Sequence, residues 1–551
     1  MSGRAPRTPN SFCPRYAPAA AAAAVILSVA AGCAVGPNFV RPAAPSAAAY
    51  AAEPIPERTA SAAIAGGEAQ RFVEGLDVPG QWWTLFHSQP LNDLVAQSLK
   101  ANPGLAGAEA ALRQAMELVH AQQGFFFPTV QAGLSATRQR NAVETLSPTL
   151  TSGAPVFNLY TAQVSVGYTL DVFGGNRRQV ESLQAQSEFQ RYQLEATYLT
   201  LTSNVVAAAV QEASLRAQID ATQKVIGFER EALELLRIQY NLGAIAMSDV
   251  VAQEALLAQT LATLPGLQKQ LAAQRSLLTA LLGRLPSEAP AERFELAMLD
   301  LPQDIPVSLP SRLVDQRPDV RAAEAQLHSA SAQIGVAIAN MLPQITLGGA
   351  YGGTSTQFAT IFQPGNIFWS LAGNAVQTLF AGGTLLHRER AAVAAFDQAA
   401  AQYKSTVITA FQNVSDSLHA LQYDADTLSA QLAAERAAFQ SLEFARKGLE
   451  LGSASYLAVL SAQQAYQLAV INLTQARASR LADTVALFQA LGGGWWNRED
   501  VASAQSRFNP DSPAAAGCGR LDAAGAASMP WASCGSAPQE SNPRPAAGIA
   551  Q

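Results

Sequence analysis

Charged residues are scarce in this chain, and their scarcity excludes several classes of protein. Of 551 residues only 14% are charged, and the formal net charge is −6, so no basic surface for nucleic acid is expected. The longest apolar runs fall short of the roughly eighteen residues that a transmembrane helix requires. Membrane β-strands give a much weaker sequence signal, so a membrane protein of that kind stays possible.

Residues for enzyme chemistry are also missing. The five histidines stand singly, and the four cysteines match no zinc or redox spacing. No glycine-rich loop joins a strand to a helix in the manner of nucleotide sites. We therefore expect no enzymatic activity, no cofactor and no metal site.

Glycine and proline are both absent between Gly383 and Gly448, where apolar residues recur at a seven-residue step. Glu435 is the one break in the series Val393, Ala400, Val407, Val414, Leu421, Leu428, Leu442, Leu449. This is the seam of a coiled coil, and a helix of this length measures roughly 95 Å. A short break at 451–455 and a second helical run over 456–491 predict a helical hairpin.

The same hairpin occurs earlier, which indicates an internal duplication. A proline-free helical run begins at Asn176, a break lies at 241–246, and a helical run returns over 247–282 with a kink expected at Pro265. Shorter helices precede both hairpins. They are expected at 91–123, kinked at Asn102–Pro103, and at 311–340.

The pattern between the short and long helices has period two. Residues 160–170 alternate apolar and polar side chains, which is typical of a strand with one apolar face and one polar face in contact with water. Residues 129–140, 344–354 and 366–379 are expected to be strands as well. Strands of about ten residues or more suit a tilted membrane span. A membrane aromatic belt is expected from Tyr160, Tyr168, Phe368 and Trp369. The alternative is a sheet that packs on a soluble core.

Four strands cannot close a barrel. Backbone groups in lipid must all be paired, and barrels begin at about eight strands. The chain is therefore expected to contribute strands to a barrel that an oligomer shares. Each strand pair is followed by a glycine turn before the long helix, because glycine lets the chain change direction without a Cβ clash. The turn residues are Gly174, Gly175, Gly382 and Gly383.

The N-terminus has the features of a secretory signal. Residues 1–32 combine a positively charged start, a short apolar run and small residues directly before Cys33. This arrangement resembles a bacterial lipobox, except that Ala30 stands where leucine is usual. The resemblance implies lipidation of the Cys33 thiol. Ordinary signal cleavage, with Cys33 as a bystander, is the alternative.

The segment Cys33-Ala-Val-Gly-Pro-Asn-Phe-Val-Arg-Pro42, the segment 81–94 and the Gly-Gly-Gly-Trp-Trp run at 492–496 resemble one known family. They are similar to the TolC-like outer-membrane factors of the NodT/OprM type, which are channel lipoproteins of efflux pumps. The resemblance covers 33–497. It implies an α+β membrane protein, a homotrimer whose twelve-stranded β-barrel (four strands per chain) continues into a long periplasmic α-helical barrel.

The resemblance also implies a function. It is that of the outer-membrane exit duct of a tripartite, RND-type efflux system, which passively conducts drugs or other small solutes. The implied partners are a periplasmic adaptor, an inner-membrane transporter and outer-membrane lipid. The implied location is the cell outer membrane, with a lipid anchor and an extension into the periplasm. A type I protein-secretion outlet is an alternative. A non-conducting, lipid-anchored envelope scaffold is another, but it does not explain the paired amphipathic strands.

In the resembled family the closed periplasmic end carries a segment of the form Tyr-Leu-x-x-Leu-Asp-Ala-Gln. Here Leu457 matches the hydrophobic gate position, Ser461 replaces the usual Asp, and Ala458 stands where some members have another Asp. Asp249 keeps an acid in the first hairpin. A helix N-terminal residue favoured by the helix dipole is an equal interpretation of Asp249. In the oligomer each gate residue is repeated around the axis and forms a ring. We predict that packing of the Leu457 ring stabilises the closed state more than rings of acidic side chains do.

The predicted organisation follows from these segments. A lipoprotein signal peptide (1–32) precedes a lipid-anchored strap (33–90), in which Trp82 and Trp83 are expected to pack a short helix against the body. The first repeat (91–286), a linker (287–310) and the second repeat (311–497) follow. The tail (498–551) is rich in Ala, Ser, Gly and Pro and is expected to be disordered.

Overall fold

The structure is a computed structural model that describes residues 34–47, 49–51, 53–140, 156–499 and 501. The chain divides into two compact units, Met1–Arg498 and Glu499–Gln551, and the elements below belong to the first. The signal segment, Cys33 and nearly all of the tail lie outside the described residues. What the sequence predicts for them therefore stays a prediction.

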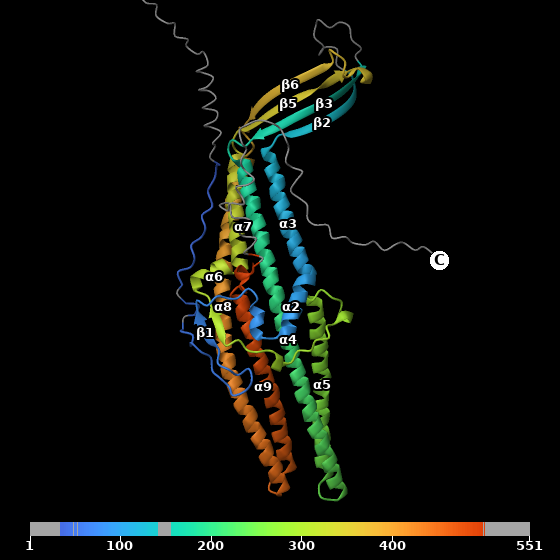
Figure 1. The fold of residues 1–551 in the computed structure, drawn as a ribbon, viewed down its shortest axis with the longest axis vertical. Helices are drawn as coiled ribbons and strands as arrows, with labels where there is room; N and C mark the ends of the chain where they lie inside the picture. The colour runs from blue at the N-terminus through green and yellow to red at the C-terminus, as the bar shows by residue number, and fades with distance from the viewer. Residues whose placement is uncertain (1–33, 48, 52, 141–155, 500, 502–551) are drawn as a thin grey trace, which may run out of the picture. The chain divides into compact units, whose positions relative to one another are not determined.

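Two long helical hairpins repeat one pattern (Figure 1). The first consists of α4, Gly175–Asn241, and α5, Met247–Leu281. The second consists of α8, Thr384–Glu450, and α9, Tyr456–Ala490. Both long helices have 67 residues and both returning helices have 35, which confirms the duplication. α5 stays one helix across Pro265.

A pair of shorter helices precedes each hairpin. They are α2, Gln89–Ala101, and α3, Pro103–Gln123, then α6, Pro310–Gln316, and α7, Pro318–Ala339. The prediction of one helix at 311–340 was wrong, because Arg317 is in an extended conformation and separates α6 from α7. The prediction of one kinked helix at 91–123 was wrong as well, because Asn102 is in an extended conformation and separates two helices. Its side-chain oxygen accepts the backbone N–H of Gly104 at 2.8 Å and so caps α3. The physical reason is that a residue before proline avoids the helical conformation.

The seven-residue stripe of α8 is buried in its middle. Val414, Leu421 and Leu428 have no exposed surface, whereas Val393 and Leu449 near the ends are 36% and 37% exposed. Each enclosed side chain contributes about 1.5–3 kcal/mol relative to an exposed one. The middle of the stripe therefore holds α8 against its neighbours α7 and α9.

One antiparallel sheet contains both predicted strand pairs. Its order is β2-β3-β5-β6, with β2 at Thr129–Arg140, β3 at Val156–Leu170, β5 at Gln344–Ser355 and β6 at Ile367–Val376. β3 pairs with β5 across the duplication, and Tyr160 lies opposite Ser355. The sheet therefore combines strands of both repeats, and β2 and β6 are its outer strands.

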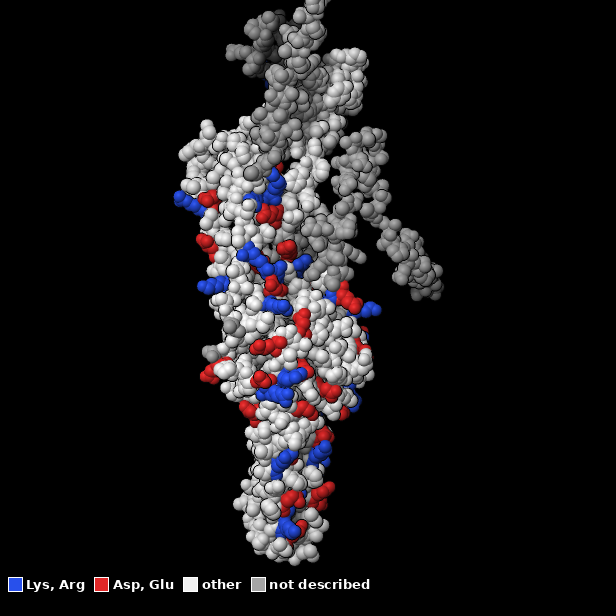
Figure 2. Space-filling model, turned by 60° about the vertical axis from the view of Figure 1, so that its left-hand side comes forward, with Lys and Arg blue, Asp and Glu red and all other residues white. Residues whose placement is uncertain are grey.

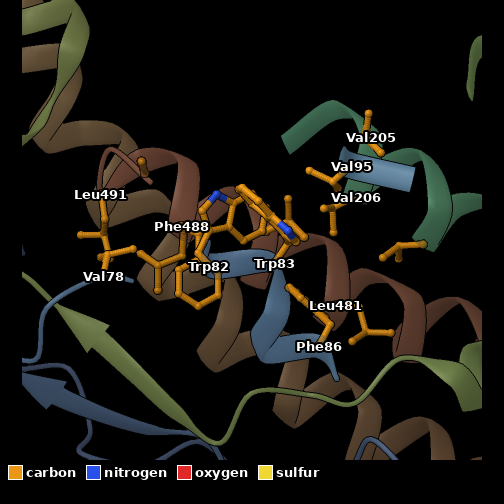
Figure 3. Close-up of a cluster of buried hydrophobic side chains, with 14 of the residues drawn as sticks. Val78, Trp82, Trp83, Phe86, Val95, Val205, Val206, Leu481, Phe488 and Leu491 are labelled. Carbon is orange, nitrogen blue, oxygen red and sulfur yellow. The ribbon is translucent and has the colours of Figure 1, made fainter. Parts of the chain in front are cut away.

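The main hydrophobic core lies where the N-terminal strap meets the helices (Figure 3). The short 3-10 helix η1, Trp82–Phe86, is buried there. The ring of Trp82 stacks on Phe488 of α9, with 5.3 Å between the ring centroids. This confirms the expected packing of Trp82 and Trp83.

The strap and the linker pair with each other, which the sequence did not predict. β1, Arg71–Glu74, runs parallel to β4, Asp304–Val307, in a separate two-stranded sheet. The fully buried Arg480 of α9 donates to the carbonyl oxygen of Glu68 at 2.6 Å and to that of Gly66 at 3.2 Å. The strap is thus held by specific hydrogen bonds to the helical body.

Short 3-10 turns complete the described elements: η2, Gly124–Phe126; η4, Pro286–Glu288; η5, Leu296–Met298; η6, Phe358–Thr360; and η7, Trp495–Asn497. None of the helices in the described part of the chain has both the length and the apolar character that a membrane crossing requires.

Candidate functional site

The strand register sorts the side chains of the larger sheet into two faces, because neighbouring residues of a strand point to opposite sides. One face carries large apolar side chains from all four strands, which are 38% to 82% exposed. They are Val130, Leu134, Val164, Val166, Leu347, Tyr351, Ile367, Trp369 and Leu371. An exposed apolar patch of this extent marks a surface that another apolar phase covers.

The opposite face is polar. It carries hydroxyl and amide side chains, namely Thr129, Gln131, Ser135, Thr161, Gln163, Ser165, Gln344, Thr346, Thr354, Ser370 and Asn374. The hydroxyls of Thr161 and Thr354 lie 3.0 Å apart across β3 and β5. Within the four described strands of this sheet only Arg138 and Arg140 are charged, and the register places both at the end of the apolar face, where β2 ends. One face therefore suits lipid and the other suits water.

The four aromatic residues expected to form a belt do not share one face. Tyr160, Tyr168 and Trp369 belong to the apolar face, whereas Phe368, which directly precedes Trp369, belongs to the polar face. The two tyrosines are eight residues apart on β3, a separation of about 26 Å at 3.3 Å per residue. Trp369 pairs with Tyr351, at a level midway between them. The tyrosines thus mark the two ends of the apolar face, and Phe368 is excluded from it.

Glycines make the turns from the sheet into the long helices. Gly174, with φ of 75°, directly precedes α4, and Gly175 is the first residue of that helix. Gly382 and Gly383, with φ of 57° and 83°, precede α8. A positive φ of this size is favourable only for glycine. The tight turns therefore require glycine at 174, 382 and 383, whereas Gly175 already has a helical conformation.

The first described residues of the chain, 34–36, are fixed at the first of these turns. The N–H of Val35 donates to the carbonyl oxygen of Phe173 at 3.1 Å. A Cβ on Gly174 would lie 2.6 Å from the Cα of Ala34. The buried guanidinium of Arg178 donates to the carbonyl oxygens of Val35, at 3.1 Å, and of Gly36, at 3.3 Å. Residues 34–36 are thus docked beside the junction of sheet and helix.

The predicted gate residues lie in the first turns of α5 and α9, directly after the breaks at 242–246 and 451–455 that form the hairpin tips. Leu457 is 71% exposed, and Ala458 and Ser461 are exposed as well. Leu457 and Ser461 are four residues apart and so share one side of α9. Asp249 lies in the first turn of α5 and is half-buried. Within one chain the gate side chains of α9 are uncovered, and Asp249 is covered in part.

A buried hydrogen-bonded chain behind these tips was not predicted from the sequence. The Tyr456 hydroxyl donates to Gln253 Oε1 at 2.6 Å, and Gln253 Nε2 donates to the carbonyl oxygen of Glu229 at 2.9 Å. The Glu229 carboxylate accepts from the Thr260 hydroxyl at 3.0 Å. Gln253 and Glu229 are both fully buried. In the sequence they resemble any other polar residue of a long helix.

Two residues of this hydrogen-bonded chain, Glu229 and Tyr456, have pKa values above their ordinary ones. Burial raises the pKa of Glu229 to about 7, and the hydrogen bond from Thr260 lowers it only in part. Burial, with Asp249 and Glu229 nearby, raises the pKa of Tyr456 to about 12. The first hairpin therefore contains, behind its tip, a buried carboxyl that changes its charge near neutral pH.

On the face shown in Figure 2, acidic and basic side chains are interspersed along the helices. Among the described residues, no group of three His, Cys, Asp or Glu side chains is arranged to hold a metal ion.

A two-faced sheet joined to two long helical hairpins defines the class of a membrane channel subunit. The family described as outer membrane efflux protein matches residues 94–284 and 309–493, and the chain belongs to this family. The probable efflux pump outer membrane protein SepC of Pseudomonas putida is 30% identical over 487 residues, which cover 86% of this chain and 96% of SepC. The pyoverdine export outer membrane protein OpmQ of the same species is 29% identical over 453 residues, which cover 80% and 94%.

Solved structures show the same fold. The outer-membrane channel OprN is 27% identical, with a TM-score of 0.75 over 84% of this chain and 100% of OprN. VceC of Vibrio cholerae is 24% identical, with a TM-score of 0.70 over 76% of this chain and 100% of VceC. The predicted family and α+β channel fold are confirmed, and so are the efflux function and the outer-membrane location.

Proposed function

We propose that three copies of this chain close one twelve-stranded barrel in the outer membrane and form a passive duct for small solutes. The observation that carries this proposal is the sheet, with an exposed apolar face, a polar face, and β2 and β6 as outer strands. In lipid the outer edges must be paired, so β2 of one copy pairs with β6 of the next. The apolar face then meets lipid and the polar face lines water.

A lipid anchor at Cys33 fits this arrangement. Ala34, the next residue, lies against Gly174 at the end of the sheet, where the bilayer ends in the proposed barrel. A diacylglycerol on Cys33 would reach the membrane without an intervening linker. Labelled palmitate that enters the wild-type protein but not a Cys33→Ser variant would support the anchor, and equal labelling would refute it.

We further propose that the hairpin tips form the periplasmic gate and the contact with the efflux partners. Leu457 is the principal barrier, because its exposed side chain is repeated around the axis of the trimer. A periplasmic adaptor meets the tips and connects them to an inner-membrane transporter, which supplies the energy. Relatives are named for pyoverdine export and for toluene efflux, which makes small organic solutes the expected cargo.

Planar-bilayer conductance of the purified trimer tests the duct and its gate. The wild type should give small, rare openings, and Leu457→Ala should give large and frequent ones. A matched control is Leu468→Ala, which removes an equally exposed leucine farther along α9, 60% exposed against 71%. If no variant conducts although its trimer is intact, the proposal of a duct is contradicted. Equal effects of the two substitutions would contradict a gate at Leu457.

A further inference from the structure

A fully buried carboxyl in the first hairpin, behind its tip, has no part in the function described so far. Glu229 of α4 has no exposed surface, and its Oε2 has no hydrogen-bond partner in the described part of the chain. Its Oε1 accepts only from Thr260, whose hydroxyl also lies 3.2 Å from the carbonyl oxygen of Leu256. A buried carboxylate with a single neutral partner is costly unless it carries a proton.

The charged groups around Glu229 do not compensate a negative charge. The pKa of Glu229 is set by burial and by the hydrogen bond from Thr260 of α5, with no cation among its causes. Asp249 of α5 and Glu229 both raise the pKa of the Tyr456 phenol of α9, so these neighbours supply no positive charge. From α8, Arg446 lies over the ring of Phe228, 5.9 Å from its centroid, and pairs with Glu443. Arg237 of α4 is bound to Glu234 and Glu254. An ionised Glu229 would therefore be buried without a cation.

The side chain of Gln253 connects this position to the second hairpin. Its amide nitrogen donates to the backbone carbonyl oxygen of Glu229, and its amide oxygen accepts from the Tyr456 hydroxyl. Tyr456 is the first residue of α9, directly before Leu457. Its ring also packs on the apolar cluster of Leu233, Leu236 and Val250. One buried amide thus ties the first hairpin to the residue that precedes the gate leucine.

We propose that Glu229 and Gln253 are positioning residues for the tip gate, which hold Tyr456 and the neighbouring Leu457 in the closed arrangement until Glu229 ionises. The inference rests on the proposed gate. With a proton, Glu229 is neutral and the buried chain is stable. Without the proton, the carboxylate gains water only if α5 moves away from α4, which displaces Gln253 from Tyr456. Rising pH should therefore open the duct.

The sign and size follow from linkage. A carboxyl with a raised pKa binds its proton more tightly in the closed state, so the closed state loses stability as pH rises through about 7. If opening solvates the carboxyl, the open-to-closed ratio rises about tenfold per chain between pH 6 and pH 8. Ionisation of Tyr456 plays no part there, because its pKa is about 12.

Open probability of the full-length trimer in planar bilayers at pH 6 and pH 8 tests this inference. The wild type should open about tenfold more at pH 8 if one chain moves alone and up to about a thousandfold more if three chains open together, and Glu229→Gln should open rarely at both values. Tyr456→Phe should open more than the wild type already at pH 6, because it lacks the bond to Gln253. The matched control is Glu231→Gln, which removes an exposed carboxyl of the same helix and should keep the wild-type response.

The outcomes separate the two proposals. Channels that open at rates independent of pH, or an unchanged pH response in Glu229→Gln, would overturn the role of Glu229 and leave the duct intact. No conductance from any variant, Leu457→Ala included, would refute the duct itself. In that case hydrogen exchange over 226–236 and 250–260 still tests the coupling. Protection, corrected for intrinsic rates, should fall from pH 6 to pH 8 in the wild type and not in Glu229→Gln.

Discussion

Replacement of Gly36 by alanine should undock the segment that follows the predicted lipidation site. Gly36 has φ of 91°, and a Cβ added to it would lie 2.5 Å from the Cα of Gly335. Both backbones are enclosed here, because a Cβ on Gly335 would in turn lie 2.9 Å from the carbonyl oxygen of Val35. The clash is between backbone atoms, which cannot move aside as the end of a flexible side chain could.

The magnitude follows from strain and lost hydrogen bonds. The left-handed backbone costs an alanine about 1–2 kcal/mol. Arg178 would lose its bonds to the carbonyl oxygens of Val35 and Gly36, and a bond from a charged donor contributes about 1.5 kcal/mol or more. The sum is about 4 kcal/mol, which lowers the docking equilibrium about a thousandfold.

Gly75→Ala is the matched control, because Gly75 has φ of 75° but nothing within 4 Å of an added Cβ. It carries the backbone strain without the clash. Hydrogen exchange of the Val35 amide, which is bonded to Phe173, is the readout. We expect exchange to be faster by up to about three orders of magnitude in Gly36→Ala and nearly unchanged in Gly75→Ala. Equal exchange in the two variants would refute the reasoning.

Three further predictions concern the seam, the sheet and a buried acid pair. Leu421→Ala should lower the free energy of unfolding by about 2–5 kcal/mol, because Leu421 has no exposed surface, and an unchanged dissociation temperature of the trimer would contradict this. Leu134→Arg, on the apolar face, should cost about 2–4 kcal/mol near the middle of a bilayer, whereas Ser135→Arg on the polar face should cost little. Urea titration of protein folded into vesicles compares the two, and equal midpoints would contradict the assignment of the faces. Burial and a hydrogen bond with Asp483 raise the pKa of Asp424 to about 7, so the folded protein loses stability as pH rises through that value. The unfolding temperature should fall less between pH 5 and pH 8 in Asp424→Asn than in the wild type, and equal slopes would count against the pair.

Local periodicity was sufficient to predict most elements. The seven-residue stripe of α8 and the alternation in β3 are properties of neighbouring residues, so they are visible without a structure. The same alternation places Phe368 and Trp369 on opposite faces, and their grouping in one belt was an error of interpretation. Asn102 shows a second limit, because a break and a kink at X-Pro have the same sequence signal.

Contacts between distant segments were not predictable in this way. Gln253 and Tyr456 belong to different hairpins, and the sequence around each residue does not predict a contact with the other. The parallel pairing of β1 with β4 joins the strap to the linker across the whole first repeat. Such pairs depend on how the helices pack, and packing is a property of the whole chain.

The sequence by itself determined the class of this protein. The duplicated heptads predict paired helical hairpins, the two-faced strands predict a sheet between lipid and water, and the glycine turns predict the connections between them. Only the tertiary structure decided which polar residues are buried. Glu229 and Glu231 are chemically identical and two positions apart on one helix, yet one is enclosed and the other is exposed. The difference arises from α5 and α9, which cover one side of α4 and remove water from the carboxyl that faces them.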